Sequence, residues 1–375
     1  MVILLVILIT SYMLQKVQLA LSILCLISLN IDLSAQYDFD IVNQVENTDV
    51  KSQGKTGTCW SFASISFLES EVMRTKGESI DLSEMYIVRD VYKDKARNYI
   101  LRQGKANFSE GSLAHDMLAA GLRDGLVPEQ AYSGKKTDQH NHKKLFKELK
   151  NYLDGIVQNH KIPSNWESKV DSILNKNLTE YTDSFILNEK DYTAKSYYDY
   201  LGLDLNKYIN VTSFTHHKFN KEFILEIPDN YANGSYLNVE IDRLQNMVDN
   251  AIEAGHSVIW DGDVSEKGFS AQRGLAINPV AFNEKCFDQP CEEKNVSQKD
   301  RQTAFENYST TDDHLMHIVG ISNDKSGGKY YIIKNSWGEI SDYKGYLMMS
   351  ESYFRAQTVA VTLNKDFVQE VKSEE

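Results

Sequence analysis

The sequence predicts an α+β fold built as two lobes, a helical lobe followed by a β-rich lobe. Apolar residues recur at helical spacing after residue 59, whereas after residue 256 the apolar segments are short and bounded by Gly, Asn, Asp or Ser. The chain has 375 residues, of which 42% are hydrophobic and 25% are charged. This balance is typical of a globular protein that can bury one large core or two lobes. Helices first and strands later favour the α+β class.

Residues 1 to 35 are predicted to be an export signal. Two apolar stretches, "MVILLVILIT" and "LALSILCLISL", flank Lys16, which would be the basic region, and "LSA" forms a small-residue cleavage site before Gln36. Met13 is then an alternative start. We therefore expect an exported protein, periplasmic or secreted, that keeps no stable membrane span after cleavage. An uncleaved membrane anchor is the alternative, although each apolar run alone is short for a bilayer.

Residues 36 to 134 are assigned to an N-terminal segment and the helical lobe. The first helix is expected over residues 59 to 75, because its apolar side chains follow helical spacing and Gly77 supplies a stop signal. A second helix is expected in "DLSEMYIVRDVYKDKARNYI", capped by Asp81 or Ser83. A third is expected in "SEGSLAHDMLAAGLRDGLVP", ending near Gly125.

Residues 135 to 250 are predicted to be a helical insertion, and residues 251 to 375 a β-rich lobe with the C-terminal tail. The insertion is charged and rich in tyrosine, with its clearest helices in "KKLFKELKNYLDGI" and "IDRLQNMVDNAIEAG". The last lobe contains the strand-like segments "HSVIWDGD", "HIVGIS", "KYYIIKNSW", "GYLMMS" and "TVAVTL".

The charge and the histidine pairs argue against two classes of function. The formal net charge is −13, and no long run of Lys or Arg supplies the phosphate contacts of a nucleic-acid-binding protein. The fragments His216-His217 and His140-Asn141-His142 resemble metal-binding motifs, but no ligand set in the sequence completes them, and we interpret them as surface loops. We therefore expect no nucleic acid, no metal and no organic cofactor.

The cysteines single out one residue. Cys25 would leave with the signal, and Cys286 and Cys291 in "CFDQPC" could close a short disulfide loop in an oxidising compartment. Cys59 is then left unpaired, at the predicted N-terminus of the first helix. A thiol attacks a carbonyl as the thiolate, and the positive end of a helix dipole favours that anion. Cys59 is therefore a candidate nucleophile.

The remaining parts of a thiol-based site are a base, a group that orients it and an oxyanion donor. His314 and His317 in "DDHLMHIVGI" precede an apolar strand, and imidazole can accept and return a proton near neutral pH. Side chains alternate along a strand, so both histidines cannot meet Cys59. Asn335 in "IIKNSWG" could fix the histidine tautomer, and Gln53 could donate to the oxyanion.

Three further residues accompany these candidates. Asp261 and Asp263 in "WDGDVSEKG" could line the cleft and hold a substrate ammonium, or they could form a solvated turn. Trp337 is interpreted as a shield that keeps water from the contact between the histidine and Asn335. A reductant would be needed to protect an exposed thiol of low pKa from oxidation.

The segments "QGKTGTCWSF", "DHLMHIVGI" and "KNSWG", in this order, resemble the papain-type cysteine peptidases. Within that superfamily the chain is most similar to the bleomycin hydrolase and aminopeptidase C branch, which carries a large insertion. The separation 314 − 59 = 255 requires such an insertion, because the papain pattern places its histidine about 130 to 150 residues after its cysteine. The segments "LSEMYIVRD" and "WDGDVSEKGF" extend the resemblance.

The resemblance implies a papain-like two-lobed fold, with a helical lobe, an antiparallel β lobe and a large helical insertion. It also implies a cysteine peptidase that hydrolyses peptides through a thioester acyl-enzyme. It places the nucleophile on Cys59, the base on His314, which stands six residues before Gly320, the orienting amide on Asn335 and the oxyanion donor on Gln53. It also implies aminopeptidase action, which in that branch depends on a C-terminal tail in the cleft, and a homo-hexamer. The tail "NKDFVQEVKSEE" matches no tail known in the branch. A papain-like endopeptidase with an open cleft and an inactive peptide-binding scaffold are therefore the alternatives.

Overall fold

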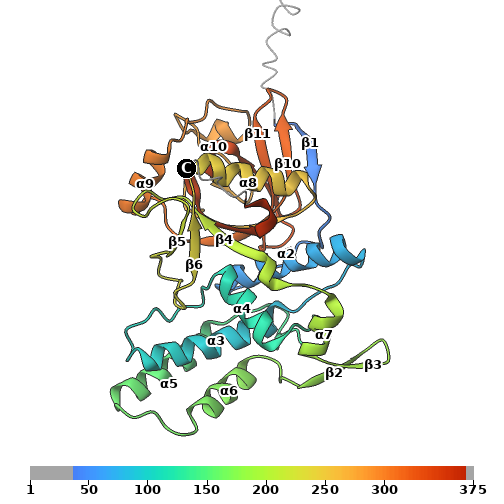
Figure 1. Cartoon of the computed structure of the whole chain (residues 1–375), viewed down its shortest axis with the longest axis vertical. Coiled ribbons are helices and arrows are strands. Elements are labelled where there is room, and N and C mark those ends of the chain that lie inside the picture. Colours follow the sequence, from blue (N-terminus) through green and yellow to red (C-terminus); the bar gives the residue numbers. More distant parts are fainter. Residues whose placement is uncertain (1–36, 369–375) are drawn as a thin grey trace, which may run out of the picture.

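The computed structural model describes residues 37–368, which form a helical lobe and a lobe built on one large sheet (Figure 1). The predicted signal, residues 1 to 35, lies outside the described residues, as does the end of the tail from residue 369. Within 37–368, none of the helices combines the length and the apolar character needed to cross a bilayer.

The first lobe is a group of helices around one apolar core. They are α2 (Cys59–Lys76), α3 (Glu84–Leu101), α4 (Ala114–Asp124), α5 (Lys143–Gln158) and α6 (Trp166–Asn177). α3 begins where the side chain of Ser83 accepts a hydrogen bond from the N–H of Tyr86, which is one of the two predicted caps. α2 ends at Gly77, whose φ of 67° lies in the left-handed region that favours glycine. A hairpin of β2 (Ser184–Leu187) and β3 (Lys190–Thr193) then leads into α7 (Ala194–Leu201) and the short helix η1 (Leu205–Lys207).

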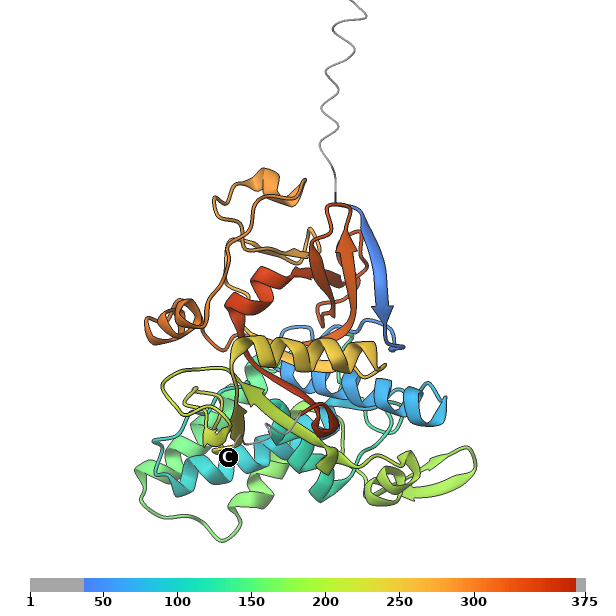
Figure 2. The same cartoon turned by 45° about the horizontal axis from the view of Figure 1, so that its top comes forward.

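The second lobe is an 11-stranded sheet in the order β5-β6-β4-β13-β7-β10-β11-β12-β9-β8, with β1 paired to β10. Its strands are β1 (Phe39–Gln44), β4 (Tyr208–Thr212), β5 (Lys221–Ile224), β6 (Ser235–Asn238), β7 (Val258–Gly262), β8 (Phe269–Ser270), β9 (Leu275–Ala276), β10 (His314–Asp324), β11 (Lys329–Lys334), β12 (Tyr346–Ser350) and β13 (Thr358–Asn364). The central pairs are antiparallel, as predicted, but β4–β6 and β9–β12 are parallel. Figure 2 shows the blue strand β1 beside the orange strands β10 and β11.

Helices and loops cover the sheet. α8 (Ile241–Glu253) packs its apolar face on the sheet core. α10 (Glu351–Gln357) contacts β11, β12 and β13, and α9 (Gln298–Glu306) contacts α10 (Figure 1). The short helix η2 (Glu284–Phe287) belongs to the loop that the Cys286–Cys291 disulfide closes, and η3 (Lys365–Phe367) follows β13. Cys59 is the free cysteine of residues 37–368.

Two of the predicted domain ranges contain strands that belong to the sheet of the second lobe. The range 135 to 250, expected to be a helical insertion, also supplies β4, β5 and β6 to the large sheet, and its last helix, α8, packs on that sheet. The range 36 to 134, assigned to the helical lobe, supplies β1. These strands have four to six residues, too few for a period-2 pattern to stand out, and their pairing partners lie far away in sequence.

Candidate active site

Cys59 stands at the seam between the lobes, as the first residue of α2. α2 contacts α3 and α4 on one side and β10 and β7 on the other, so its N-terminus faces both lobes (Figure 1). The backbone of Leu315, the residue after His314, hydrogen-bonds the Cys59 thiol. The sulfur therefore lies beside the start of β10, and the fold brings together two residues 255 positions apart (314 − 59).

His314 and Asn335 form a buried hydrogen-bonded pair. His314 is the first residue of β10, and the distance from its Nε2 to Oδ1 of Asn335 is 2.8 Å. In the antiparallel register His317 lies opposite Lys334. Asn335, the residue after Lys334, is therefore placed near the start of β10, where His314 lies. An amide oxygen can only accept, so Nε2 of His314 carries the proton and Nδ1 is the nitrogen left to act as a base.

Trp337 covers this pair. Its ring centroid lies 4.7 Å from that of His314, and its side chain is 36% exposed. An indole packed against the imidazole limits the access of water to the hydrogen bond between His314 and Asn335, which strengthens that bond.

Gln53 is held by groups from both lobes. The hydroxyl of Ser336 donates to Gln53 Oε1 at 2.7 Å, and Gln53 Nε2 donates to the carbonyl of Thr56 at 2.7 Å. A side-chain amide has two N–H groups, so this arrangement retains one for a further acceptor. The loop from Gln53 to Cys59 is thus fixed in the neighbourhood where an oxyanion donor is required.

Burial dominates the protonation of the catalytic pair. It raises the pKa of the Cys59 thiol to about 12; the carboxyls of Asp312 and Asp261 act in the same direction. Burial also lowers the pKa of His314 to about 4, although the hydrogen bond to Asn335 opposes this shift. The expectation of an exposed thiol of low pKa is wrong, because Cys59 is only 8% exposed and has carboxyls as neighbours.

His317 faces away from Cys59. Its Nδ1 lies 2.9 Å from the hydroxyl of Ser66, which is seven residues further along α2, and the ring is fully buried. The ammonium of Lys334 donates to the same hydroxyl at 2.8 Å. The alternation of side chains along β10 thus sends His314 to the cleft and His317 into the seam behind it.

A cavity of about 410 Å³ opens beside Cys59. Its lining residues come from both lobes: Lys55, Thr56, Gly57, Cys59, Glu110, Gly111, Ser112, Asp229, Asp312, Asp313 and Leu315. Sequence reasoning did not identify Glu110, Asp229, Asp312 or Asp313. Only the position of Asp312 and Asp313 directly before His314 could have suggested two of them.

The two aspartates that the sequence singled out have different environments. Asp263 accepts hydrogen bonds from the N–H of Ser265 and of Thr311, so it organises a turn. Asp261 is buried on β7 and lies against Asp312. Both side chains are buried, so neither forms a solvated turn. Neither lines the cavity itself, but Asp261 contacts Asp312 and Asp263 contacts Asp313, and both of these partners line it.

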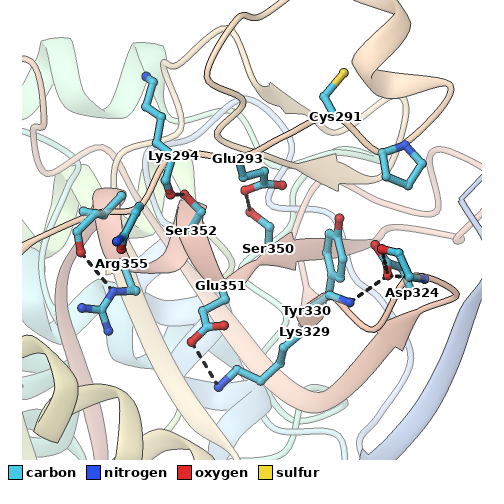
Figure 3. Close-up of a pocket in the computed structure, with 15 residues that line it drawn as sticks. Cys291, Glu293, Lys294, Asp324, Lys329, Tyr330, Ser350, Glu351, Ser352 and Arg355 are labelled. Atoms are coloured by element: carbon cyan, nitrogen blue, oxygen red, sulfur yellow. Dashed lines mark hydrogen bonds and ion pairs between the residues drawn. The ribbon is translucent and has the colours of Figure 1, made fainter.

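A larger cavity, of about 490 Å³, lies elsewhere on the β-rich lobe (Figure 3). It is formed by β11, β12, α10 and residues 290–296, and Figure 3 shows Lys329 directed at Glu351 and Ser350 directed at Glu293. Its lining contains neither Cys59 nor a histidine, and its cysteine, Cys291, is in a disulfide. Its size alone does not make it an active site.

One of the two histidine fragments differs from the surface loops that were expected. His140 and His142 are buried, and burial lowers the pKa of each to about 4. The pair His216 and His217 does lie on a partly exposed turn, but Glu226 joins it, with 2.7 Å between His217 Nε2 and Glu226 Oε1. The carboxylate accepts from both rings, which fixes the turn between β4 and β5.

Comparisons with known proteins agree with this geometry. Residues 175–375 match the model of the Peptidase C1-like family, and residues 35–198 match that of the Papain family cysteine protease. The chain is 24% identical to aminopeptidase C of Lactococcus lactis subsp. cremoris over 364 residues, which cover 86% of this chain and 81% of that protein. It is 31% identical to human bleomycin hydrolase over 160 residues, which cover 41% of this chain and 34% of that protein.

A solved structure gives the same fold. The crystal structure of PepW from Lactobacillus rhamnosis superposes with a TM-score of 0.70 at 16% identity, covering 88% of this chain and 83% of that one. Together with the two family models, this likeness confirms the predicted papain-like fold of the α+β class.

Proposed function

Since the chain belongs to the Peptidase C1-like family, we propose that it is a cysteine aminopeptidase, which removes N-terminal residues from peptides through a thioester acyl-enzyme. The observation that carries this proposal is the 2.8 Å hydrogen bond between His314 and Asn335 beside a free cysteine at the start of α2. The relatives named aminopeptidase C support the choice of an exopeptidase.

The proposed acylation step uses Cys59 as the nucleophile and His314 as the base. As the sulfur of Cys59 attacks the peptide carbonyl, its proton moves to Nδ1 of His314. Asn335 holds the ring through Nε2, so the imidazolium that forms keeps its orientation. The carbonyl oxygen becomes an oxyanion, which accepts from the backbone N–H of Cys59 and the remaining N–H of Gln53.

The intermediate collapses as His314 returns the proton to the leaving amine. The C–N bond breaks, the shortened peptide departs, and the removed residue remains as a thioester on Cys59. Water then attacks the thioester as His314 takes its proton, and the same donors stabilise the second oxyanion. The C–S bond breaks, the removed residue leaves as a free amino acid, and His314 returns the proton to the sulfur of Cys59. Every group in this cycle is a side chain or backbone group of the chain itself.

The test of this function uses Cys59→Ser and one pair of substrates. A peptide with a free amino group should lose its N-terminal residue with the native protein, and its N-acetylated twin should remain intact. Cys59→Ser should reduce turnover by at least about 1,000-fold, because hydroxyl is the poorer nucleophile with this base, while circular dichroism stays unchanged. Unchanged turnover in that variant would refute the proposal.

The same experiment separates the alternatives. Cleavage of the acetylated peptide at internal bonds would identify an endopeptidase with an open cleft. Binding of peptides without any cleavage, together with an unreactive Cys59, would identify an inactive scaffold.

We further propose that the protein is exported and that residues 1 to 35 are removed. The disulfide between Cys286 and Cys291 supports an oxidising compartment. The mass of the protein purified from its own host tests this idea, since the expected mature chain begins at Gln36.

The homo-hexamer implied by the resemblance is part of the proposal too, and light scattering of the purified protein would decide it.

A further inference from the structure

The cavity that contains Cys59 is strongly acidic. Four carboxylates line it, from loops of both lobes: Glu110, Asp229, Asp312 and Asp313. Lys55 is the basic residue among the lining groups. A cavity with this excess of one sign of charge attracts ligands of the opposite sign.

A fifth carboxyl, that of Asp261, lies directly behind this wall. Asp261 is 4% exposed, and its carboxyl is in hydrogen-bonding contact with that of Asp312. Within residues 37–368, no N–H donor reaches either oxygen of Asp261 or Oδ2 of Asp312. β7 and β10 place Asp261 opposite Leu315, which lines the cavity and touches the Cys59 thiol.

This pair is unusual for a protein interior. Buried carboxyls normally receive hydrogen bonds, and two that face each other can only share a proton. Burial accordingly raises the pKa of Asp312 to about 7, and it raises that of Asp261 as well. The carboxyl pair therefore has no positively charged hydrogen-bond donor from the protein. A cationic group of a ligand can reach it through the adjoining cavity, which Asp312 lines.

Two of the other three carboxylates are fixed in position. Glu110 accepts a hydrogen bond from the N–H of Gly57 at 2.8 Å, and Asp229 accepts from Asn107 at 2.7 Å and from Ser109 at 2.9 Å. At Gly111 a Cβ atom would lie 1.8 Å from Oδ2 of Asp229, so a side chain there would displace this carboxylate. The wall is therefore preorganised.

The positive groups of the same region do not neutralise the wall. Lys95 is buried behind it and donates to the carbonyl of Gly111, with Ser109 Oγ at 3.4 Å. With Lys55 it gives two ammonium groups against five carboxyls. Even with one proton shared between Asp261 and Asp312, the region keeps a net negative charge.

The chemistry of an aminopeptidase places one ligand group here. When a single residue is removed, only one Cα separates the free ammonium from the carbonyl that the thiol attacks, and neighbouring Cα atoms are about 3.8 Å apart. A protein group that recognises this ammonium must therefore share a cavity with the nucleophile. An ammonium offers three donors and a positive charge, which are what the carboxyl pair lacks.

We propose that Asp312, with Asp261 behind it and Asp229 and Glu110 beside it, forms a fixed subsite that binds the free α-ammonium of the substrate's N-terminal residue. This inference rests on the proposed aminopeptidase function. It assigns the recognition of the amino group to side chains of the two lobes, independently of the C-terminal tail, whose end lies outside the described residues.

The subsite has a second effect on the reaction. The carboxyls of Asp312 and Asp261 favour the protonated form of the Cys59 thiol. A bound ammonium compensates their charge, so a substrate with a free amino group promotes the ionisation of the thiol that attacks it. A blocked peptide supplies neither the anchor nor this compensation.

One double variant and a matched control test the subsite. The double variant Asp261→Asn/Asp312→Asn keeps the shape of both side chains, and Asp288→Asn removes one carboxylate from an exposed position of the β-rich lobe. The substrates are the best of a panel of aminoacyl 4-nitroanilides and its N-acetylated twin. Because hydrogen bonds between charged groups are lost, we expect kcat/KM for the free-amine substrate to fall about 10- to 100-fold in the double variant. Asp288→Asn should match the native protein.

A binding experiment gives a readout that does not depend on turnover. Iodoacetamide alkylates Cys59, and alaninamide should slow this reaction in the native protein, whereas N-acetylalaninamide should not. In the double variant alaninamide should no longer protect. Equal protection by the two amides, or protection that survives in the double variant, would overturn the subsite.

The outcomes keep the two proposals apart. If the native protein cleaves neither anilide, the aminopeptidase proposal fails, and the alkylation experiment alone decides whether an ammonium site exists. If the native protein prefers the free amine and the double variant keeps that preference, aminopeptidase action stands and the subsite is refuted. Melting temperatures of all variants check the fold; should the double variant not fold, Asp312→Asn alone, at the half-buried position, replaces it.

Discussion

At the scale of single residues, Asn335 determines which nitrogen of His314 can act. Its Oδ1 accepts from Nε2 of His314 at 2.8 Å and from the N–H of Ser336 at 2.7 Å. The second contact holds the amide in the orientation that makes the first possible. Asn335 is thus a positioning residue that acts through the imidazole.

We predict that Asn335→Ala lowers kcat about 10- to 100-fold with little change in KM, because a ring that can rotate spends less time in the reactive geometry. Steady-state kinetics on a free-amine peptide measure this effect. Asn335→Gln, whose longer side chain retains the amide, should recover part of the loss. An unaltered kcat in Asn335→Ala would show that burial and Trp337 alone orient His314.

The thiol shows how local and tertiary effects compete at one residue. The start of a helix favours the thiolate, which is the effect visible in the sequence. In the structure, burial and the carboxyls of Asp312 and Asp261 raise the pKa of the Cys59 thiol. They outweigh the opposite effect of the helix N-terminus. Neither burial nor the two carboxyls have a signature near Cys59 in the sequence, because both carboxyls lie more than 200 positions away (261 − 59 = 202).

At the scale of elements, α2 is anchored to the sheet lobe by one buried carboxylate. Glu71 lies 2.9 Å from Arg74 and 3.3 Å from the ring nitrogen Nδ1 of His256, and it accepts a hydrogen bond from Tyr208 at 3.1 Å. Burial disfavours the charged form of Glu71, but hydrogen bonds and charges of His256 and Arg74 outweigh burial and lower its pKa to about 2. The carboxylate therefore stabilises the fold.

We predict that Glu71→Gln lowers the free energy of unfolding by about 3 kcal/mol at pH 7, which corresponds to a pKa of about 2 in the fold against 4.5 for the unfolded chain. A carboxyl with a lowered pKa contributes fully above pH 4.5, and this contribution disappears as the pH falls from 4.5 to 2. The difference between native protein and variant should thus shrink to less than half at pH 3. Urea unfolding at both pH values measures it, with Glu253→Gln, on the exposed face of α8, as control. A difference independent of pH would contradict the assignment.

At the scale of the whole molecule, the two lobes are joined by a buried network behind the active site. Lys51 binds Glu84 at 2.7 Å and Glu69 at 3.2 Å. Thr48 contacts Glu69 and also accepts from Lys334 of β11 at 2.9 Å. Burial raises the pKa of Glu84 to about 7, while Lys51 opposes this shift. The network links α2 and α3 to β11, the strand that Asn335 directly follows.

We predict that Lys51→Met lowers the free energy of unfolding by about 3 kcal/mol, since it leaves two buried carboxyls without their cation. Because Lys51 lies two residues before Gln53, the oxyanion loop should loosen as well and kcat should decrease. Chemical denaturation and limited proteolysis at the seam measure both effects. Lys325→Met, which removes an exposed ion pair with Asp40, is the control and should change stability by less than about 1 kcal/mol. Equal effects of the two substitutions would show that the network does not join the lobes.

The sequence was informative where a pattern is local. α2, α3 and the strands β7, β10, β11, β12 and β13 lie where periodicity and turn residues predicted them. The short strands β4, β5 and β6 were missed, because their stability comes from pairing with β13 and with one another rather than from an apolar pattern of their own. The burial of His140 and His142 was also missed, because it comes from packing in the folded lobe and not from a local apolar pattern.

The sequence by itself determined the chemical type of this protein. Cys59 at a helix start, His314 at the start of a strand and Asn335 after the next strand carry enough local identity to predict the nucleophile, the base and the orienting group. Only the tertiary structure decided what surrounds them: the protonation of the thiol, the seam network and the acidic cavity. These depend on desolvation and on distances between charges far apart in the chain, and both quantities exist only once the lobes have packed.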